Sequence, residues 1–170
     1  NITIDGKEFN YSGTIYIHGN ARHTGAETLT IQNVNFTTEE ASHDFISSNS
    51  TGAVERYAHN VTVKNCEFTS TYTGEEKNEV VAMRFRQAYD IEVIGGVFNN
   101  LHSVMWTTGT SEVKVKDIVA TGCKEGGISF GTSTDLVVEN AIINVVENEN
   151  NDMPNYGIRV DASVATTLTV

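Results

Sequence analysis

The chain has 170 residues, a formal net charge of −11 and a single proline. This length suits one domain with a sizeable core. The acidic balance argues against a nucleic-acid partner, because binding to phosphates needs a basic surface. No stretch of about 18 consecutive apolar residues is present, so no membrane span is predicted.

One short pattern recurs along the chain. Two apolar residues flank a polar one, a residue that tolerates a left-handed backbone follows, and apolar side chains return two or three positions later. The copies begin at residues 2, 29, 61, 91, 113, 136 and 168. The shortest spacing is 22 residues, and the longer spacings indicate the same unit with insertions.

Each copy predicts two short strands separated by a one-residue bend. In the third copy, Val61 and Val63 would face inward, and Asn65 would form the bend. Stacked copies would bring the bend residues into one polar column, with glycine at positions 6 and 95 and with Asn33, Asn65, Asp117 and Asn140 elsewhere. A second column would be an inner aromatic stack of Phe9, Phe36, Phe68 and Phe98.

Each interval between copies contains one more predicted strand. The candidates, in chain order, are residues 14–17, 44–46, 81–85, 104–106, 127–130 and 157–160. Three strands per repeat, each stacked about 4.8 Å from its equivalent in the next repeat, form the coils of a solenoid. The prediction is an all-β domain over residues 1–170, with about six coils and with long loops flanking the third strand.

The asparagine column after an apolar-x-apolar strand, on a repeat of at least 22 residues, resembles the parallel β-helix of the pectate-lyase-like superfamily. The resemblance covers the whole chain and implies a right-handed, single-stranded parallel β-helix. It also implies that the third strands form the floor of a cleft, as they do in enzymes of this fold. Because the chain begins and ends within predicted strands, we expect a fragment of a longer repeat protein, with adjacent coils or domains beside it.

Alternation along the third strands predicts which side chains face outward. The outward set, with two residues at its margins, is Tyr16, Arg84, Ser129 and Arg159, then Arg86 and His102. The fourth coil is ambiguous, because either Met105 faces inward or Val104 and Trp106 do. We expect a ligand on this face, between the loops at 69–79 and 144–155, since loops on a rigid scaffold usually display binding groups. An acidic glycan is the expected ligand, because guanidinium groups pair well with carboxylates.

Three functions are compatible with this pattern. The favoured one is an extracellular domain of a bacterial surface or secreted protein, a carbohydrate-binding, adhesin or display module without complete catalytic machinery. The resemblance also allows a polysaccharide lyase or glycoside hydrolase acting on an acidic polysaccharide, with Arg84 or Arg159 as base. However, the carboxylates that would support it, Asp44 and Asp161, are not on neighbouring coils. The third function is a purely structural solenoid segment, as in a phage tail fibre.

No cofactor is expected, because the five histidines lack the spacing of metal ligands. Acidic loops at residues 39–40, 75–76 and 147–149 are candidates for weak calcium binding, although none has the spacing of an EF-hand. The expected partner is a polysaccharide or a glycan on a host or other cell surface. The expected location is extracellular, or the surface of a bacterial cell.

Overall fold

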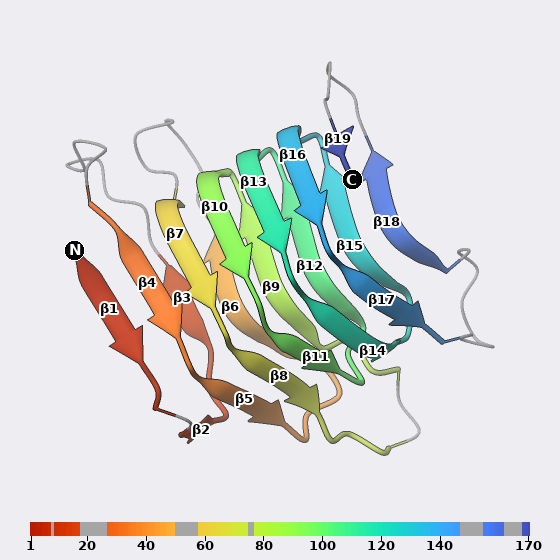
Figure 1. Cartoon of the computed structure of the whole chain (residues 1–170). Coiled ribbons are helices and arrows are strands. Elements are labelled where there is room, and N and C mark those ends of the chain that lie inside the picture. Colours follow the sequence, from red (N-terminus) through yellow and green to blue (C-terminus); the bar gives the residue numbers. More distant parts are fainter. Residues whose placement is uncertain (8, 18–26, 50–57, 75–76, 147–154, 162–167) are drawn as a thin grey trace.

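The computed structural model describes residues 1–7, 9–17, 27–49, 58–74, 77–146, 155–161 and 168–170. The chain forms a right-handed parallel β-helix of six coils with three strands each, which confirms the predicted fold class (Figure 1). The solenoid runs from β1 (Ile2–Asp5) at one end to β18 (Tyr156–Asp161) and β19 (Leu168–Thr169) at the other.

Three parallel sheets form the sides of the solenoid. Sheet A contains β1, β4 (Leu29–Gln32), β7 (Ala58–Lys64), β10 (Ala88–Ile94), β13 (Ser111–Lys116), β16 (Thr134–Glu139) and β19. Sheet B contains β2 (Asn10–Tyr11), β5 (Asn35–Thr38), β8 (Glu67–Ser70), β11 (Val97–Asn99), β14 (Val119–Cys123) and β17 (Ile142–Val145). Sheet C contains β3 (Ile15–Ile17), β6 (Asp44–Asn49), β9 (Val81–Arg86), β12 (Ser103–Thr108), β15 (Gly126–Gly131) and β18.

The register of sheet A follows the sequence repeat. Parallel pairing aligns, from one coil to the next, Ile2, Leu29, Val61, Ile91, Val113, Leu136 and Leu168. These residues are the first apolar positions of the seven copies, so one copy corresponds to one coil. The period of the apolar pattern was therefore sufficient to predict the strand pairing.

The bend column between sheets A and B is also confirmed. Asn33, Asn65, Asp117 and Asn140 all have φ between 50° and 55°, which is the left-handed region. The backbone amides of Asn33, Asn65 and Asp117 donate to carbonyls of the next coil, as Asn65 does to the carbonyl of Ile94 at 2.9 Å. In the first coil, however, the left-handed residue is Lys7 rather than the predicted Gly6.

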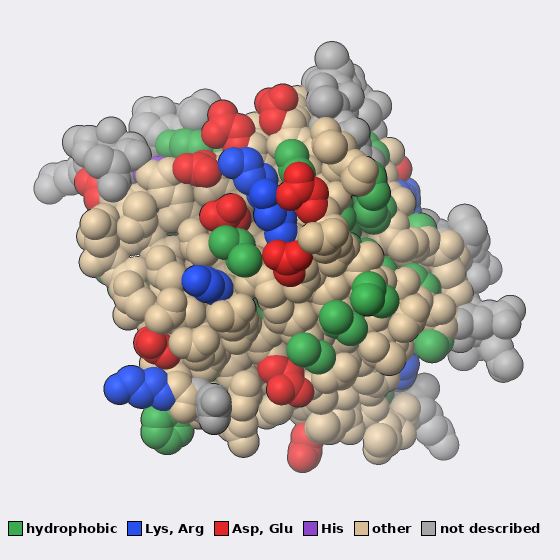
Figure 2. Space-filling view, viewed as in Figure 1, with side chains coloured by type: hydrophobic (Ala, Val, Ile, Leu, Met, Phe, Trp, Pro, Cys, Tyr) green, Lys and Arg blue, Asp and Glu red, His purple; other side chains and the backbone are tan. Residues whose placement is uncertain are grey.

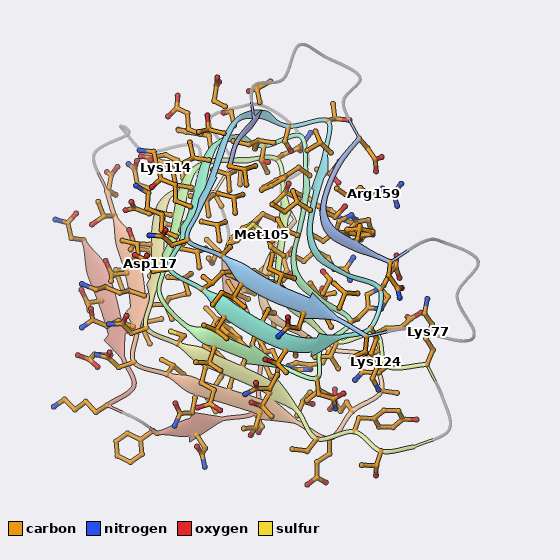
Figure 3. The ribbon with its side chains drawn as sticks, turned by 45° about the vertical axis from the view of Figure 1, so that its right-hand side comes forward. Lys77, Met105, Lys114, Asp117, Lys124 and Arg159 are labelled. Carbon is orange, nitrogen blue, oxygen red and sulfur yellow. The ribbon has the colours of Figure 1, made fainter. Side chains whose placement is uncertain are left out.

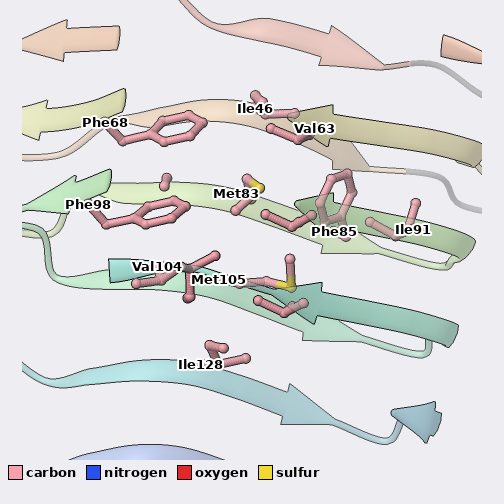
Figure 4. Packing of buried hydrophobic residues seen from close by; sticks show 14 of the residues in the cluster. Ile46, Val63, Phe68, Met83, Phe85, Ile91, Phe98, Val104, Met105 and Ile128 are labelled. Atoms are coloured by element: carbon pink, nitrogen blue, oxygen red, sulfur yellow. The ribbon is translucent and has the colours of Figure 1, made fainter. Parts of the chain in front are cut away.

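Phenylalanine rings stack inside sheet B, as predicted for three of the four residues. The Phe36 and Phe68 rings lie 4.7 Å apart and nearly parallel, and the Phe68 and Phe98 rings lie 5.0 Å apart (Figure 4). The placement of Phe9 in this stack is wrong, because its side chain is 74% exposed. The Phe9 amide donates to the Gly6 carbonyl, and β2 begins only after Phe9. Tyr11 therefore pairs with Phe36 instead.

The other corners contain left-handed residues that sequence reasoning missed. One column precedes the apolar pair in four sheet A strands, β7, β10, β13 and β16, and contains Asn60, Asp90, Glu112 and Asp135. Another follows the sheet C strands and contains Gln87, Gly109 and Thr132. Both columns lie between a sheet C strand and the apolar pair of the following sheet A strand, so they set where the third strand of a coil ends.

Gly95 and Gly96 give a matched pair of predictions about the bend column. Gly96 has φ near 125°, and a Cβ there would lie 2.7 Å from the carbonyl oxygen of Cys66. We expect Gly96→Ala to lower the free energy of unfolding by about 1–3 kcal/mol. At Gly95, φ is 65° and asparagine occupies the same column in other coils; a Cβ would lie 2.6 Å from Asn65 Oδ1, the end of a side chain that can rotate away. Gly95→Asn should therefore change the free energy of unfolding by less than about 1 kcal/mol. Equal effects in urea denaturation would contradict this placement of the bend.

Sheet B carries an exposed apolar row on its outer side. Val97, Val119 and Ile142 pair from coil to coil and are each at least 40% exposed. Figure 2 shows hydrophobic side chains over β11, β14 and β17, apart from the Lys, Arg, Asp and Glu side chains above sheet A. Among the described residues, no helix is long and apolar enough to cross a membrane.

Candidate functional site

One row of outward positions runs along sheet C through all six coils. Cα pairing aligns Tyr16, Ser47, Arg84, Trp106, Ser129 and Arg159. Four of these residues were predicted to face outward, and the structure places them in one row about 24 Å long, given a spacing of about 4.8 Å per coil. Arg86 lies two positions after Arg84 on β9 and is exposed.

The ambiguity in the fourth coil is resolved in favour of an outward Trp106. Met105 and Thr107 are buried, whereas the Trp106 side chain is 38% exposed. Figure 3 shows Met105 between the sheets and Arg159 on the outside of the solenoid. The row therefore has an accessible indole at its centre.

Two hollows lie along this row. The larger, of about 360 Å³, is lined by residues that include Trp106, Ser129, Tyr156 and Arg159. The smaller, of about 290 Å³, is lined by Tyr16, Asp44, Ser47, Ser48, Arg84 and Arg86. Arg84 lines both, so the hollows adjoin and form a shallow cleft along the solenoid axis, which we call the sheet C cleft.

Arg84 is held at the centre of the cleft by two neighbours. Its Nε donates to both carboxylate oxygens of Asp44, at 2.8 and 3.0 Å. Its guanidinium carbon lies 4.2 Å from the centre of the Trp106 ring, within the range of a cation–π contact. The Arg86 guanidinium lies 5.8 Å from the same ring. The hydrogen bonds to Asp44 hold the Arg84 guanidinium in place, and its contact with the Trp106 ring orients the indole.

The C-terminal end of the cleft repeats this arrangement. Arg159 Nε lies 2.8 Å from Asp161 Oδ2, and this hydrogen bond raises the pKa of Arg159. The guanidinium also lies 5.7 Å from the centre of the Tyr156 ring. This ring packs directly against Gly126, where a side chain would collide with it. Burial raises the pKa of the Tyr156 phenol, and its hydrogen bond with Ser129 opposes this effect. Ser129 belongs to the outward row but is covered, with 4% exposure.

His102 and Glu125 line the rim of the larger hollow, and Lys77 lies beside Glu125. His102 Nε2 lies 2.6 Å from Glu125 Oε2, and Lys77 Nζ lies 3.6 Å from the same oxygen. The His102 and Glu125 side chains are each 16% exposed. His102 Nδ1 is buried with no hydrogen-bond partner among the described residues, which fits a neutral ring that carries its proton on Nε2. Sequence reasoning missed Glu125, although its spacing of 23 residues from His102 equals about one coil.

The His102 ring gives a prediction about pH. Burial lowers the pKa of this imidazole, and the nearby Glu125 carboxylate opposes the effect, as does Glu79, whereas Lys77 and Arg84 reinforce it. As the pH falls below about 6.5, the unfolded chain gains a proton that the folded chain does not, so the free energy of unfolding decreases. His102→Gln keeps a donor for Glu125 but cannot titrate.

Urea denaturation of both proteins between pH 8 and pH 5 tests this prediction. The difference in stability should be constant above pH 7, and the wild type should then lose stability relative to the variant as the pH falls. A wild type that gains relative stability in acid would show that Glu125 holds a proton on His102 instead.

The calcium candidates gain no support from the described residues. No group of three or more His, Cys, Asp or Glu side chains among them is arranged to bind a metal ion. In the candidate at residues 39–40, Glu40 Oε2 lies 3.1 Å from His43 Nδ1. The candidates at 75–76 and 147–149 lie outside the described residues, as do parts of the loops at 69–79 and 144–155.

A larger hollow, of about 840 Å³, lies at the corner between sheets A and B. Its lining includes Asp5, Asn33, Asn65 and Val97, and none of the described residues in this lining is aromatic. Asp5 already accepts hydrogen bonds from the side chains of Gln32 and Asn33, which lower its pKa. The polar groups of this corner therefore belong to the hydrogen-bonded column of bend residues, and the sheet C cleft is the better candidate for a ligand site.

The fold and this cleft define the class of protein: a parallel β-helix with a polar and aromatic cleft along one sheet. Comparison of the chain with protein-family models, with curated proteins and with solved structures finds no match. The function is therefore inferred from the geometry of the cleft.

Proposed function

We propose that this chain is an extracellular β-helix domain of a bacterial surface or secreted protein that binds a polysaccharide or cell-surface glycan along the sheet C cleft. The observation that carries the proposal is the row of outward residues, in which an exposed Trp106 lines the larger hollow next to Arg84, the residue that lines both hollows. An axial row suits an extended polymer, because successive coils present equivalent positions at a regular spacing. The resemblance of the repeat to the pectate-lyase-like superfamily supports the same face as the binding surface.

The chemistry of the lining also favours a sugar. Aromatic rings with polar edges stack on the apolar faces of sugars and still donate hydrogen bonds, and Trp106 and Tyr156 both line the larger hollow. Charged side chains around them, including Arg84 and Glu125, offer donors and acceptors for hydroxyl groups. Its volume of about 360 Å³ is in the range of small-ligand sites.

A glycan array, followed by fluorescence titration of each hit, tests the proposal. Trp106 is the only tryptophan in the chain, so its emission reports directly on the cleft. We expect at least one glycan to bind and to shift this emission. An array without hits would contradict carbohydrate binding and favour a purely structural segment, and a hit that leaves the emission unchanged would place the ligand elsewhere.

A polysaccharide-cleaving enzyme is the second candidate, favoured by a pair of carboxylates at the rim of the larger hollow. Lys77 Nζ lies 3.9 Å from Glu79 Oε1 and 3.6 Å from Glu125 Oε2. The two carboxylates are therefore no more than about 7.5 Å apart, which is compatible with the separations that glycosidases use. Release of reducing ends or of unsaturated uronates from a bound glycan, lost in Glu125→Gln, would support this candidate.

A further inference from the structure

We infer that the sheet C cleft takes an uncharged glycan in preference to a uronate. This inference rests on the proposed function, because it concerns the class of carbohydrate that the cleft binds. It departs from the acidic ligand that the arginines in the sequence suggest. Three features of the cleft carry it: the pairing of its arginines, the balance of its charges and the hydrogen-bonding character of its lining.

The arginines at the two ends of the larger hollow are already paired with carboxylates of the protein. Arg84 donates to both oxygens of Asp44, and Arg159 lies 2.8 Å from Asp161. A uronate that contacted the remaining N–H groups of either guanidinium would share a positive charge that a carboxylate of the protein already neutralises. Its electrostatic gain is therefore smaller than at an unpaired arginine.

The balance of charge in the cleft points the same way. Among the described residues, the linings of the two hollows contain four carboxylates, Asp44, Glu79, Glu125 and Asp161, and three guanidinium groups, Arg84, Arg86 and Arg159. The whole chain has a formal net charge of −11. A polyanion would therefore approach an acidic protein and a cleft without excess positive charge, which is the opposite of electrostatic complementarity.

Sugar hydroxyls fit this lining better than carboxylates do. A hydroxyl both donates and accepts, so it can donate to Glu79 or Glu125 and accept from a guanidinium without disturbing the ion pairs. A carboxylate only accepts, so it would leave the acidic rim of the hollow without donors.

Matched pairs of oligosaccharides test the inference. The probes are oligomers of galacturonate, mannuronate and glucuronate, each compared by calorimetry with its carboxyl-reduced form of the same length and linkage. We expect the best neutral probe to bind at least about tenfold more tightly than its uronate, with a Kd that changes little between 50 and 500 mM salt. Uronates that bind as tightly as their reduced forms would overturn the inference and leave the proposed function intact. Failure of every probe and of the glycan array would instead overturn the proposed function.

A pair of variants tests the role of the ion pairs directly. Asp44→Asn with Asp161→Asn removes the internal partners of Arg84 and Arg159, so the affinity for uronates should rise at least about tenfold. The control is Asp117→Asn with Asp135→Asn, which makes the same change of charge at left-handed corner positions of the solenoid outside the cleft. Equal gains in both double variants would show that net charge alone governs uronate binding and would contradict the assigned ion pairs.

Discussion

Replacing Phe68 by alanine should lower the free energy of unfolding by about 3–5 kcal/mol. The Phe68 ring is fully buried, and it stacks between Phe36 at 4.7 Å and Phe98 at 5.0 Å. Its loss leaves a cavity in the middle of the aromatic stack. In a solenoid each coil contacts mainly its neighbours, so a central coil is where such a cavity affects the most contacts. Urea denaturation followed by circular dichroism measures the change.

Phe9→Ala is the control for this prediction. The same residue type is deleted, but the Phe9 side chain is 74% exposed and stands outside the stack. We expect a change of no more than about 0.5 kcal/mol, as for most surface substitutions. Similar losses in the two variants would contradict both the stack and the corrected position of Phe9.

Trp106→Ala should weaken glycan binding by at least about tenfold, since central aromatic side chains often account for about 2 kcal/mol of binding free energy. The indole is an exposed aromatic surface in the larger hollow, and the Arg84 guanidinium lies 4.2 Å from its ring centre. Trp106→Phe keeps a stacking surface and should retain most of the affinity. Calorimetry is the suitable measurement, because these variants lack the only tryptophan of the chain.

Val119→Ala provides the control for binding. Val119 is 40% exposed, similar to Trp106, but it lies on the apolar row of sheet B. Its truncation should leave the Kd unchanged. A loss of affinity in Val119→Ala together with normal binding by Trp106→Ala would move the binding surface to sheet B.

The sequence was sufficient for the strand pairing because packing itself repeats. An apolar-x-apolar pair fixes which side chains face inward, and the bend residue fixes where each strand ends, so Val61 and Ile91 can be aligned without coordinates. Phe9 was misplaced because the first coil has two more residues than the second between Gly6, which aligns with Asn33, and the sheet B strand. The repeat pattern does not reveal such a local insertion. The corner residues Gln87 and Thr132 were missed because their column, which also contains Gly109, has no residue type in common.

The candidate site was predicted only in part. Alternation along a strand is local, so the outward positions of Arg84 and Arg159 followed from the sequence. The partner of Arg84, in contrast, is 40 residues away and diagonal to it in the sheet, so the pairing with Asp44 depends on the register and on side-chain direction. The covering of Ser129 is likewise a property of neighbouring coils, since it depends on Tyr156.

Chemical-shift mapping by NMR of the isotope-labelled protein, titrated with the tightest-binding neutral oligosaccharide, tests carbohydrate binding in the sheet C cleft most directly. The largest shifts should occur at the indole N–H of Trp106 and at backbone amides of β9, β12 and β15, which form the floor of the larger hollow. An indole signal that does not move, with shifts confined to the corner of Asn33 and Asn65 or to the apolar row of sheet B, would contradict the assignment of the cleft.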